Sequence, residues 1–286
     1  MNAAAPDRVE FKVGRDGVEL AGEEQGAGPA IVALHGLTAT RNYVVHGSRA
    51  LPREGFRLVT YDARGHGESS PAPPGAGYAY PELAADLGAV LDARVGDRPA
   101  VLAGHSMGAH TLAAYALDHP DRIAATVIVG PASTGIPLPP ESLEFWDRLA
   151  VGLERDGVDG FVAAYDHGLD PKWREVALRI TRQRLGLHAH PEAIVRALRE
   201  VPRSVPFDGL AELTYLDLPA LVVASHDEAD PGHPHEVAAA WSERLPRATL
   251  VSEEPGQSPL AWQGGRLSRE IAAFCRRPEV AERLAG

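Results

Sequence analysis

The sequence predicts an α/β protein with a mostly parallel sheet, helices on both faces and an inserted helical cap. Three observations support this fold class. Short continuous apolar runs recur along the chain, which is typical of strands buried on both faces of a parallel sheet. Stretches with the apolar spacing of helices alternate with these runs. One long internal segment contains helical stretches and no strand-like run.

The first part of the chain predicts a hairpin, three buried strands and one helix. Residues 9–13 and 18–24 alternate between polar and apolar on either side of an Arg-Asp-Gly turn, a pattern typical of a β-hairpin. Apolar runs then predict three strands, and helical spacing predicts a helix between the second and the third. The strands span residues 30–34, 56–61 and 100–103, and the helix spans residues 81–95.

The later part of the chain continues the alternation of helices and strands. The predicted helices span residues 106–119, 235–245 and 267–274, and the predicted strands span residues 123–129, 220–224 and 248–251. Consecutive strands that are joined by helices pair in parallel, so these elements extend the same sheet.

Residues 134–206 interrupt this alternation. Helical spacing occurs at residues 141–153 and 173–187, and prolines flank the segment on both sides. We interpret the segment as a helical cap inserted into a core domain of residues 1–133 and 207–286. A cap above the strand ends shields a site from water and shapes a pocket. The alternative is that these helices merely pack elsewhere on the core.

Composition restricts the class of protein and its partners. A chain of 286 residues with 44% hydrophobic and 23% charged residues fits one large globular domain, or a core with an insertion. The net charge of -11 argues against nucleic acid and against an anionic membrane surface as partners. The single cysteine, Cys275, excludes an internal disulfide and a cysteine-rich metal site. Because no signal-like or membrane-spanning apolar stretch occurs, we expect a cytoplasmic protein with a small-molecule substrate or ligand.

Residues 104–108, Gly-His-Ser-Met-Gly, lie between a predicted strand and a predicted helix. A Gly-x-Ser-x-Gly turn at this junction gives the serine a strained backbone and points its hydroxyl out of the sheet. The flanking glycines are needed because a side chain at either place would clash in so sharp a turn. The pattern therefore predicts Ser106 as a nucleophile, the alternative being a serine in a structural turn. A neutral hydroxyl is a poor nucleophile, so Ser106 also needs a base.

Three further signals occur along the chain in the order typical of the α/β-hydrolase superfamily. Together with the Gly-x-Ser-x-Gly turn, they make the chain resemble this superfamily. These signals are His-Gly-Leu-Thr at residues 35–38, Asp-Ala-Arg-Gly-His-Gly-Glu-Ser at residues 62–69 and an acidic loop after the seventh strand. The resemblance covers nearly the whole chain and implies an eight-stranded sheet and a capped serine hydrolase. It implies that the backbone N–H groups of Leu37 and Met107 form an oxyanion hole. Backbone donors suit this role because they are fixed before charge develops on the substrate.

The resemblance also concerns the polar residues near the oxyanion loop, residues 35–38, which carries the Leu37 donor. It implies that His35 is a structural histidine that braces the oxyanion loop. Asp62, Arg64 and His66 form a polar turn near the strand ends. For these three residues we favour a hydrogen-bonded loop scaffold over a direct chemical role.

The acid of the triad has two candidates after the seventh strand. In similar proteins the acid lies four residues before a proline that opens the next helix, and Asp230 with Pro234 fits that spacing. Glu228 fits better if the count starts from the strand end at residue 224. We prefer Asp230 because proline at a helix start is a firm geometric marker. Alternatively, both carboxylates only interact favourably with the helix N-terminus.

The base is absent from the place that the resemblance implies. In similar proteins a histidine follows the last strand, and in this chain Gln257 occupies that place. No shift of register supplies a histidine, because His235 is the last one in the sequence. An amide has no usable basicity, so Gln257 can hydrogen-bond Ser106 but cannot take its proton. In a serine protease the loss of the histidine lowers turnover roughly a million-fold, which excludes an ordinary triad here.

Another histidine can replace the missing base. The candidates near the acid loop are His226, His233 and His235, and those in the cap are His167, His188 and His190. His105 adjoins the nucleophile, but successive residues in such an elbow point apart. We name His233 as the tentative replacement because Asp230, three residues earlier, can orient it. Each of these histidines can instead be a solvated or helix-capping residue.

We therefore expect a hydrolase that acts on a small ester, lactone or related carbonyl through Ser106, with an atypical or impaired triad. The first alternative is a catalytically silent protein that binds or senses a small molecule on the same fold. The second is a lyase or isomerase whose pocket polarises a carbonyl. Dehalogenase and epoxide-hydrolase chemistry are disfavoured because similar proteins of those kinds carry Asp at position 106. We expect no cofactor and no metal, since His233-x-His235 is too short a signature for zinc. The oligomeric state stays open.

Overall fold

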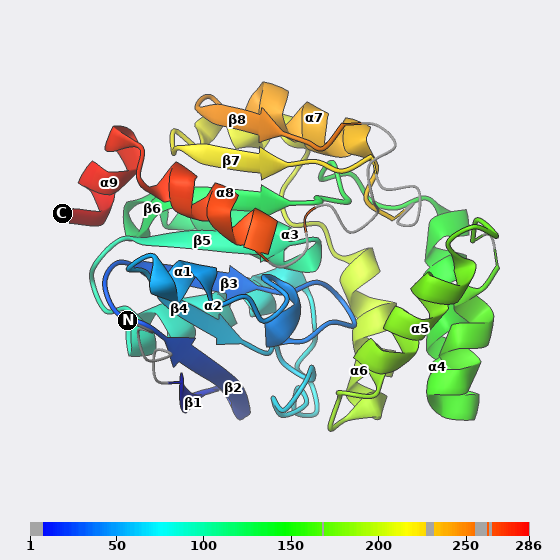
Figure 1. The fold of residues 1–286 in the computed structure, drawn as a ribbon. Helices are drawn as coiled ribbons and strands as arrows, with labels where there is room; N and C mark the ends of the chain where they lie inside the picture. The colour runs from blue at the N-terminus through cyan, green and yellow to red at the C-terminus, as the bar shows by residue number, and fades with distance from the viewer. Residues whose placement is uncertain (1–7, 168, 227–231, 255–261, 263–264, 286) are drawn as a thin grey trace, which may run out of the picture.

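The computed structural model describes residues 8–167, 169–226, 232–254, 262 and 265–285. An eight-stranded sheet in the order β1-β2-β4-β3-β5-β6-β7-β8 forms the middle of the structure (Figure 1). The pairs β1–β2 and β2–β4 are antiparallel, and all the later pairs are parallel. The predicted fold class, a mostly parallel eight-stranded α/β sheet, is confirmed.

The strands fall where the apolar runs predict them. Their bounds are β1 Arg8–Arg15, β2 Val18–Gln25, β3 Ala30–Leu34, β4 Arg57–Tyr61, β5 Ala100–His105, β6 Ile123–Val129, β7 Ala220–Val223 and β8 Ala248–Val251. Every residue of β3, β6 and β7 is buried, because helices cover both faces of these parallel strands. In β1, by contrast, buried and exposed residues alternate over its second half, as expected for a hairpin with one covered face.

Two apolar cores lie on the two faces of the sheet. Alternate residues of one strand point to opposite faces, so Leu102 of β5 lies in one core and Val101 in the other. The helices α2 (Tyr80–Arg94), α3 (Met107–Asp118) and α7 (His235–Arg244) cover the face of Leu102. The opposite face is covered by α1 (Ala50–Arg53), α8 (Gly265–Cys275) and α9 (Pro278–Ala285). Short 3-10 helices are η1 (Arg41–Tyr43), η2 (Pro120–Arg122), η3 (Val201–Arg203) and η4 (Leu210–Tyr215).

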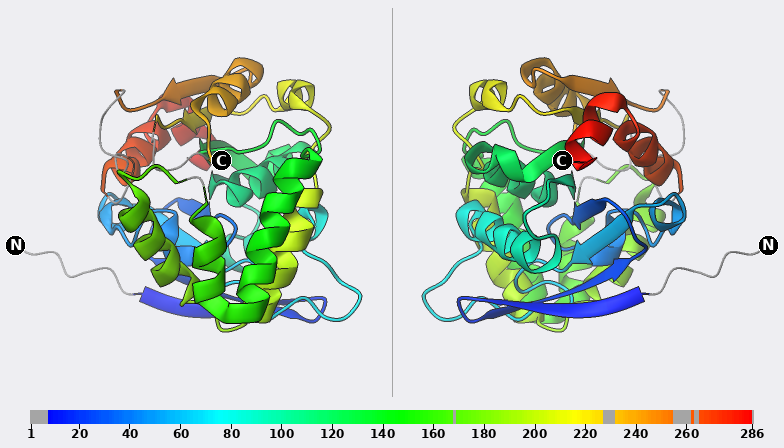
Figure 2. Two further views of the ribbon diagram at one scale, coloured as in Figure 1. Left: turned by 90° about the vertical axis from the view of Figure 1, so that its right-hand side faces the viewer. Right: turned by 90° about the vertical axis from the view of Figure 1, so that its left-hand side faces the viewer.

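Three helices lie between β6 and β7, and we call them the inserted helices. They are α4 (Pro140–Tyr165), α5 (Arg174–Leu185) and α6 (Pro191–Glu200). Figure 1 shows them together beyond the carboxyl ends of the parallel strands, and the left view of Figure 2 has them in front of the sheet. The sequence predicts the first half of α4 and the whole of α5, but not α6.

The helix α4 breaks at Asp156 and Gly157, where the backbone leaves the helical region. Gly157 has φ +63°, a conformation that favours glycine. The two halves then approach so closely that a Cβ on Gly152 would lie 2.4 Å from the carbonyl oxygen of Gly160. The break therefore turns α4 into two packed segments.

The inserted helices have an apolar core of their own. It contains Leu149, Leu153, Phe161, Ile194 and Leu198, all buried, and Phe145, Trp146 and Tyr165 pack against it. Most of the aromatic side chains of this segment therefore hold the inserted helices to one another. Among the described residues, no helix is long and apolar enough to cross a membrane.

Candidate active site

Ser106 joins β5 to α3 in a strained backbone conformation. Its φ is 53° and its ψ is −116°, a region that residues other than glycine rarely adopt and that costs about 1–3 kcal/mol. Two hydrogen bonds hold the turn: Ser106 N–H donates to the Val129 carbonyl at 3.0 Å, and His110 N–H donates to the Ser106 carbonyl at 3.1 Å. This is the backbone geometry of a nucleophile elbow.

The glycines on both sides of Ser106 are needed because backbones touch there. A Cβ on Gly104 would lie 2.3 Å from the Gly108 carbonyl oxygen. A Cβ on Gly108 would lie 2.2 Å from the Leu34 carbonyl oxygen, on the neighbouring strand β3. Neither backbone atom can move without moving the sheet, so the structure confirms the reason for both glycines.

The predicted oxyanion donor Leu37 lies in a tight turn against this elbow. Ala39 N–H donates to the Gly36 carbonyl at 3.0 Å, which closes a four-residue turn. Thr38 occupies the third position with φ 65°, a place where turns with positive φ prefer glycine. A Cβ on Gly36 would lie 3.2 Å from the Cβ of Ser106, so the turn and the nucleophile are in contact.

Met107, the other predicted donor, is the first residue of α3. The first N–H groups of a helix have no acceptor inside the helix, so the N–H of Met107 is available to a ligand or a neighbour. Its side chain is buried, and Leu37 packs against the same apolar cluster. The structure thus brings Ser106, Leu37 and Met107 together.

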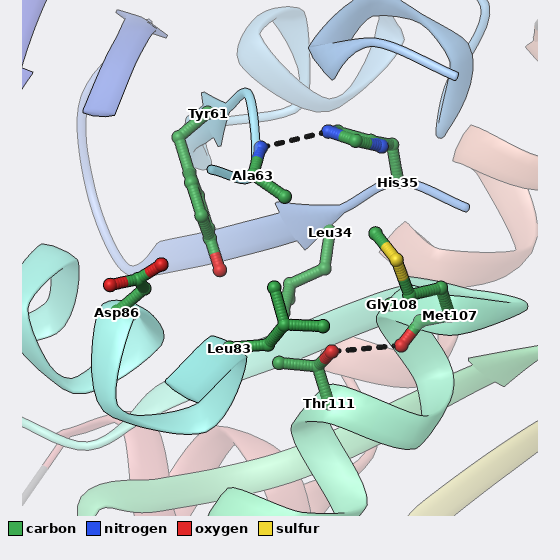
Figure 3. A pocket seen from close by; sticks show the side chains of 9 residues that line it. All are labelled: Leu34, His35, Tyr61, Ala63, Leu83, Asp86, Met107, Gly108 and Thr111. Atoms are coloured by element: carbon green, nitrogen blue, oxygen red, sulfur yellow. Dashed lines mark hydrogen bonds between the residues drawn. The ribbon is translucent and has the colours of Figure 1, made fainter. Parts of the chain in front are cut away.

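The small cavity in Figure 3 lies behind the elbow and is not a substrate pocket. Its volume is about 10 Å³, which is at most about one water molecule. The lining residues are Leu34, His35, Tyr61, Ala63, Leu83, Asp86, Met107, Gly108 and Thr111. Thr111 Oγ1 donates to the Met107 carbonyl at 2.9 Å within this wall (Figure 3). The cavity is a packing gap between α2, α3 and the sheet.

His35 braces the turn of residues 36–39, which contains the predicted oxyanion donor Leu37 and which we call the oxyanion turn. Its Nε2 accepts the Ala63 N–H at 2.9 Å, so Nδ1 carries the proton and donates to the Gly36 carbonyl at 2.8 Å. Burial lowers the pKa of His35, which keeps the ring neutral and able to make both bonds. These contacts support the bracing role that the resemblance implies.

The polar turn after β4 is a hydrogen-bonded scaffold, as the sequence favours. The Asp62 carboxylate accepts the backbone N–H of Arg41 at 2.7 Å and that of Glu68 at 3.0 Å, and it pairs with the Arg41 guanidinium. Arg64 donates to both carboxylate oxygens of Asp86, at 2.7 and 2.8 Å. The side chains of Asp62 and Arg64 therefore hold neighbouring loops and helices together by hydrogen bonds and ion pairs.

His66 completes this turn. Its Nδ1–H donates to the Arg64 carbonyl at 2.9 Å. Burial, together with the neighbouring His35 and His188, holds the pKa of His66 well below its usual range. His66 is therefore a neutral side chain of the scaffold.

The predicted replacement base His233 lies against His105 and Gly130. The centres of its ring and the ring of His105, the residue before Ser106, are 4.9 Å apart. A Cβ on Gly130, just after β6, would lie 3.5 Å from His233 Cγ and 3.6 Å from His105 Nε2. His233 therefore lies against the ends of β5 and β6, next to the residue that precedes Ser106.

His110, in α3, is a buried histidine that sequence reasoning does not single out. Its Nε2 accepts the N–H groups of Ala132 and Ser133, both at 3.1 Å, and its Nδ1–H donates to the Tyr80 hydroxyl at 2.9 Å. Burial, and secondarily the charge of His233, lower the pKa of His110 to about 3. It ties α3 to the start of the inserted segment. Its place four residues after Ser106, on the buried face of α3, is the signal that could have found it.

Two other candidate bases are engaged elsewhere. His188 uses both ring nitrogens: Nδ1 accepts the Gly67 N–H, and Nε2–H donates to the Thr38 carbonyl, both at 2.9 Å. His226 stacks on His235 with ring centres 4.0 Å apart. The structure therefore removes His188 from the candidate bases, although the sequence includes it.

Glu253 is a second residue that sequence reasoning misses. It lies two residues after the end of β8 and is 3% exposed. It accepts hydrogen bonds from Ser225 Oγ at 2.7 Å, His226 N–H at 2.6 Å and Trp262 Nε1–H at 2.7 Å. Burial alone would raise its pKa, but these hydrogen bonds outweigh burial and hold the pKa below its usual value. Glu253 thus links the loops that follow β7 and β8.

Three predicted site residues, Asp230, Glu228 and Gln257, lie outside the described residues. Their roles therefore stay predictions from the sequence.

The buried neutral histidines predict a loss of stability in mild acid. The pKa of His110 in the folded protein is about 3 and that of His188 is about 4, both below the usual 6.5. As the pH falls below 6.5, the unfolded chain binds protons that the folded chain does not, so stability falls until the folded pKa is reached. At pH 5.5 each histidine should cost about 1.4 kcal/mol relative to pH 7.5.

Urea unfolding at pH 7.5 and 5.5 measures this difference, above the range in which carboxylates titrate. His110→Gln should remove about half of the pH dependence that the two histidines produce. Equal free energies of unfolding at both pH values would show that these rings are not held neutral.

Most of the chain matches a known family. Residues 29–264 match the family described as the alpha/beta hydrolase fold. The chain therefore belongs to the alpha/beta hydrolase fold family.

Similar proteins include several hydrolases. A 2-hydroxy-6-oxononadienedioate/2-hydroxy-6-oxononatrienedioate hydrolase of Burkholderia vietnamiensis is 27% identical over 92% of this chain and 93% of its own. An sn-1-specific diacylglycerol lipase of Mus musculus is 38% identical, but the match covers 37% of this chain and 34% of the lipase. The structure of a thermophilic esterase from Thermogutta terrifontis has a TM-score of 0.77 at 25% identity, covering 94% of this chain and 98% of the esterase. These relatives support a hydrolase activity.

Proposed function

We propose that this protein hydrolyses a small ester, lactone or related carbonyl compound through Ser106, with an atypical triad. The observation that carries the proposal is the strained Ser106 elbow in contact with the turn that contains Leu37. Strain of this kind persists only where the surrounding structure holds it, and it is concentrated at functional sites. Membership of a hydrolase-rich family and the likeness to an esterase support the same reaction class.

The reaction begins when Ser106 Oγ attacks the carbonyl carbon and its proton passes to a base. The carbonyl oxygen becomes an oxyanion, which the N–H groups of Leu37 and Met107 stabilise. Collapse expels the alcohol, which takes the proton from the base, and leaves an acyl group on Ser106. Water then attacks the acyl carbonyl, releases the acid and restores the hydroxyl.

We propose His233 as the base, oriented by Asp230 or, alternatively, by Glu228. The centre of its ring lies 4.9 Å from that of His105, the residue before Ser106, and His233 follows both candidate acids in the sequence. Gln257 orients a water molecule or the Ser106 hydroxyl by hydrogen bonding but takes no proton.

His233→Gln should lower kcat for a short aryl ester by about 100-fold or more, because general bases contribute about 100- to 10,000-fold. His235→Gln is the matched control, since this histidine lies two residues after His233, at the start of α7, and stacks on His226. Its kcat should stay within about threefold of wild type. If both variants keep wild-type kcat, His233 is not the base.

We propose that residues 134–206 form the cap of this site. The inserted helices lie beyond the strand ends (Figure 1), and Leu37 packs against both their apolar core and the cluster of Met107. A cover that touches the oxyanion turn shields the reacting carbonyl from bulk water.

The second candidate function is a silent protein that binds or senses a small molecule. Gln257, in the place where related proteins are expected to carry the base, favours it. The two functions differ in turnover. Steady-state assays with 4-nitrophenyl acetate, 4-nitrophenyl butyrate and a γ-lactone test them: turnover that depends on Ser106 supports the hydrolase, and turnover at the rate of buffer supports the silent protein.

A further inference from the structure

We propose that His188, in the loop between α5 and α6, is a positioning residue that holds the oxyanion turn in its active geometry. This inference rests on the proposed hydrolase function, because it concerns the donor that Leu37 supplies. Through His188 the inserted helices would set the position of that donor as well as cover the site.

His188 connects three segments that are far apart in the sequence. Its Nδ1 accepts the N–H of Gly67 at 2.9 Å, and its Nε2–H donates to the carbonyl of Thr38 at 2.9 Å. The next residue, Ala189, donates its N–H to the Gly67 carbonyl at 2.8 Å. His188 is 8% exposed, so water competes little for these bonds.

One neutral tautomer satisfies both partners of the ring. The Gly67 N–H can only donate, so Nδ1 must be unprotonated, and the Thr38 carbonyl can only accept, so Nε2 must carry the proton. Burial lowers the pKa of His188 to about 4, which keeps this neutral form at neutral pH.

The carbonyl that His188 holds belongs to the strained residue of the oxyanion turn. Thr38 has φ 65°, and a β-branched residue in this region is a genuine outlier that costs about 1–3 kcal/mol. Without an external bond to its carbonyl, the turn can lower its energy by rotating the peptide groups on either side of Thr38. Rotation of the peptide between Thr38 and Ala39 would move the Ala39 N–H, which donates to the Gly36 carbonyl. That carbonyl belongs to the same peptide group as the Leu37 N–H, so the donor would move with it, and small displacements of catalytic groups cost up to about 100-fold in rate.

The two ends of the loop are held by the core, and its middle is held by the inserted helices. His35 donates to the carbonyl of Gly36, and Asp62 accepts the N–H of Arg41. His188 acts between these points, at Thr38. The core alone therefore fixes where the loop starts and ends, and His188 fixes the conformation of the turn.

Two variants separate the two bonds of the ring. The asparagine amide group lies near the place of Nδ1, and the glutamine amide group lies near the place of Nε2. His188→Gln thus keeps a donor for Thr38, and His188→Asn keeps an acceptor for Gly67. We expect His188→Gln to keep kcat within about threefold of wild type, and His188→Asn to lose kcat by about 10- to 100-fold with KM changed less than about threefold.

Amide hydrogen exchange tests the inference without turnover. Exchange in residues 35–41 should accelerate in His188→Asn and stay near wild type in His188→Gln, and residues 64–70 should show the reverse. In wild type, the ring nitrogens of His188 in a long-range ¹H–¹⁵N spectrum at pH 7 should show a protonated Nε2 and a bare Nδ1. This spectrum needs no variant, so it decides the matter even where a substitution prevents folding.

The outcomes distinguish the two proposals. If wild type lacks ester turnover but the exchange pattern appears, the hydrolase function fails and the positioning role of His188 stands. If wild type turns over and both variants lose the same kcat, or if residues 35–41 exchange alike in both, the positioning role is overturned. The opposite tautomer in the wild-type spectrum would overturn it too.

Discussion

Ser106→Ala is expected to lower the turnover of 4-nitrophenyl acetate by about a thousand-fold or more. The substitution removes the nucleophile, and what remains is the rate supplied by binding and the oxyanion donors alone. The loss is expected to be smaller than the roughly million-fold loss in a serine protease, because this chain has no histidine at position 257. Steady-state kinetics of the purified variant measures it.

Two further variants control this experiment. Ser142→Ala removes a hydroxyl from α4 and should leave kcat within about threefold of wild type. Ser106→Gly should lose turnover as Ser106→Ala does. It should unfold at a higher temperature than Ser106→Ala, because glycine adopts the φ of 53° at little cost. Turnover that persists in both Ser106 variants means that the serine is not the nucleophile.

Gln257→His is expected to raise kcat by about 100- to 10,000-fold. A histidine at this place supplies the general base of an ordinary triad, and such a base contributes about that factor. The gained activity should increase with pH through about 6.5, since the ring must be neutral to accept a proton. A pH–rate profile from pH 5 to 8.5 measures both effects.

Gln257→Asn is the matched control, because it keeps an amide and gains no basicity. The double variant with Ser106→Ala should lose the whole gain. If Gln257→His gives no increase while wild type turns over slowly, position 257 is not next to the nucleophile, and the assignment of the base's place is wrong.

Most of the fold follows from local patterns in the sequence. The strands β3, β5 and β6 are continuous apolar runs because helices cover both faces of the sheet. The elbow follows from two glycines whose necessity is steric and therefore visible in the residue types alone. The sequence does not predict α6 and α9. Both helices are short, and an amphipathic spacing of that length also occurs in many loops.

The polar contacts of the site could not be predicted in the same way. His188 and Thr38 are 150 residues apart. A hydrogen bond from a histidine ring to a distant backbone carbonyl produces no recognisable motif or residue spacing in the sequence. Glu253 is likewise one of two adjacent glutamates, and only the fold buries it against Ser225 and Trp262. Interpreting His188 as a candidate base was wrong because the fold commits both of its ring nitrogens to other partners.

The most direct test of an acyl transfer through Ser106 is the mass of the protein shortly after it is mixed with 4-nitrophenyl acetate and quenched in acid. If Ser106 is the nucleophile, an acetyl group is found on the peptide that contains Ser106, and it is absent from Ser106→Ala. Acyl transfer through Ser106 is contradicted if wild type releases 4-nitrophenol catalytically with no acetyl group on that peptide, or if Ser106→Ala releases it equally fast.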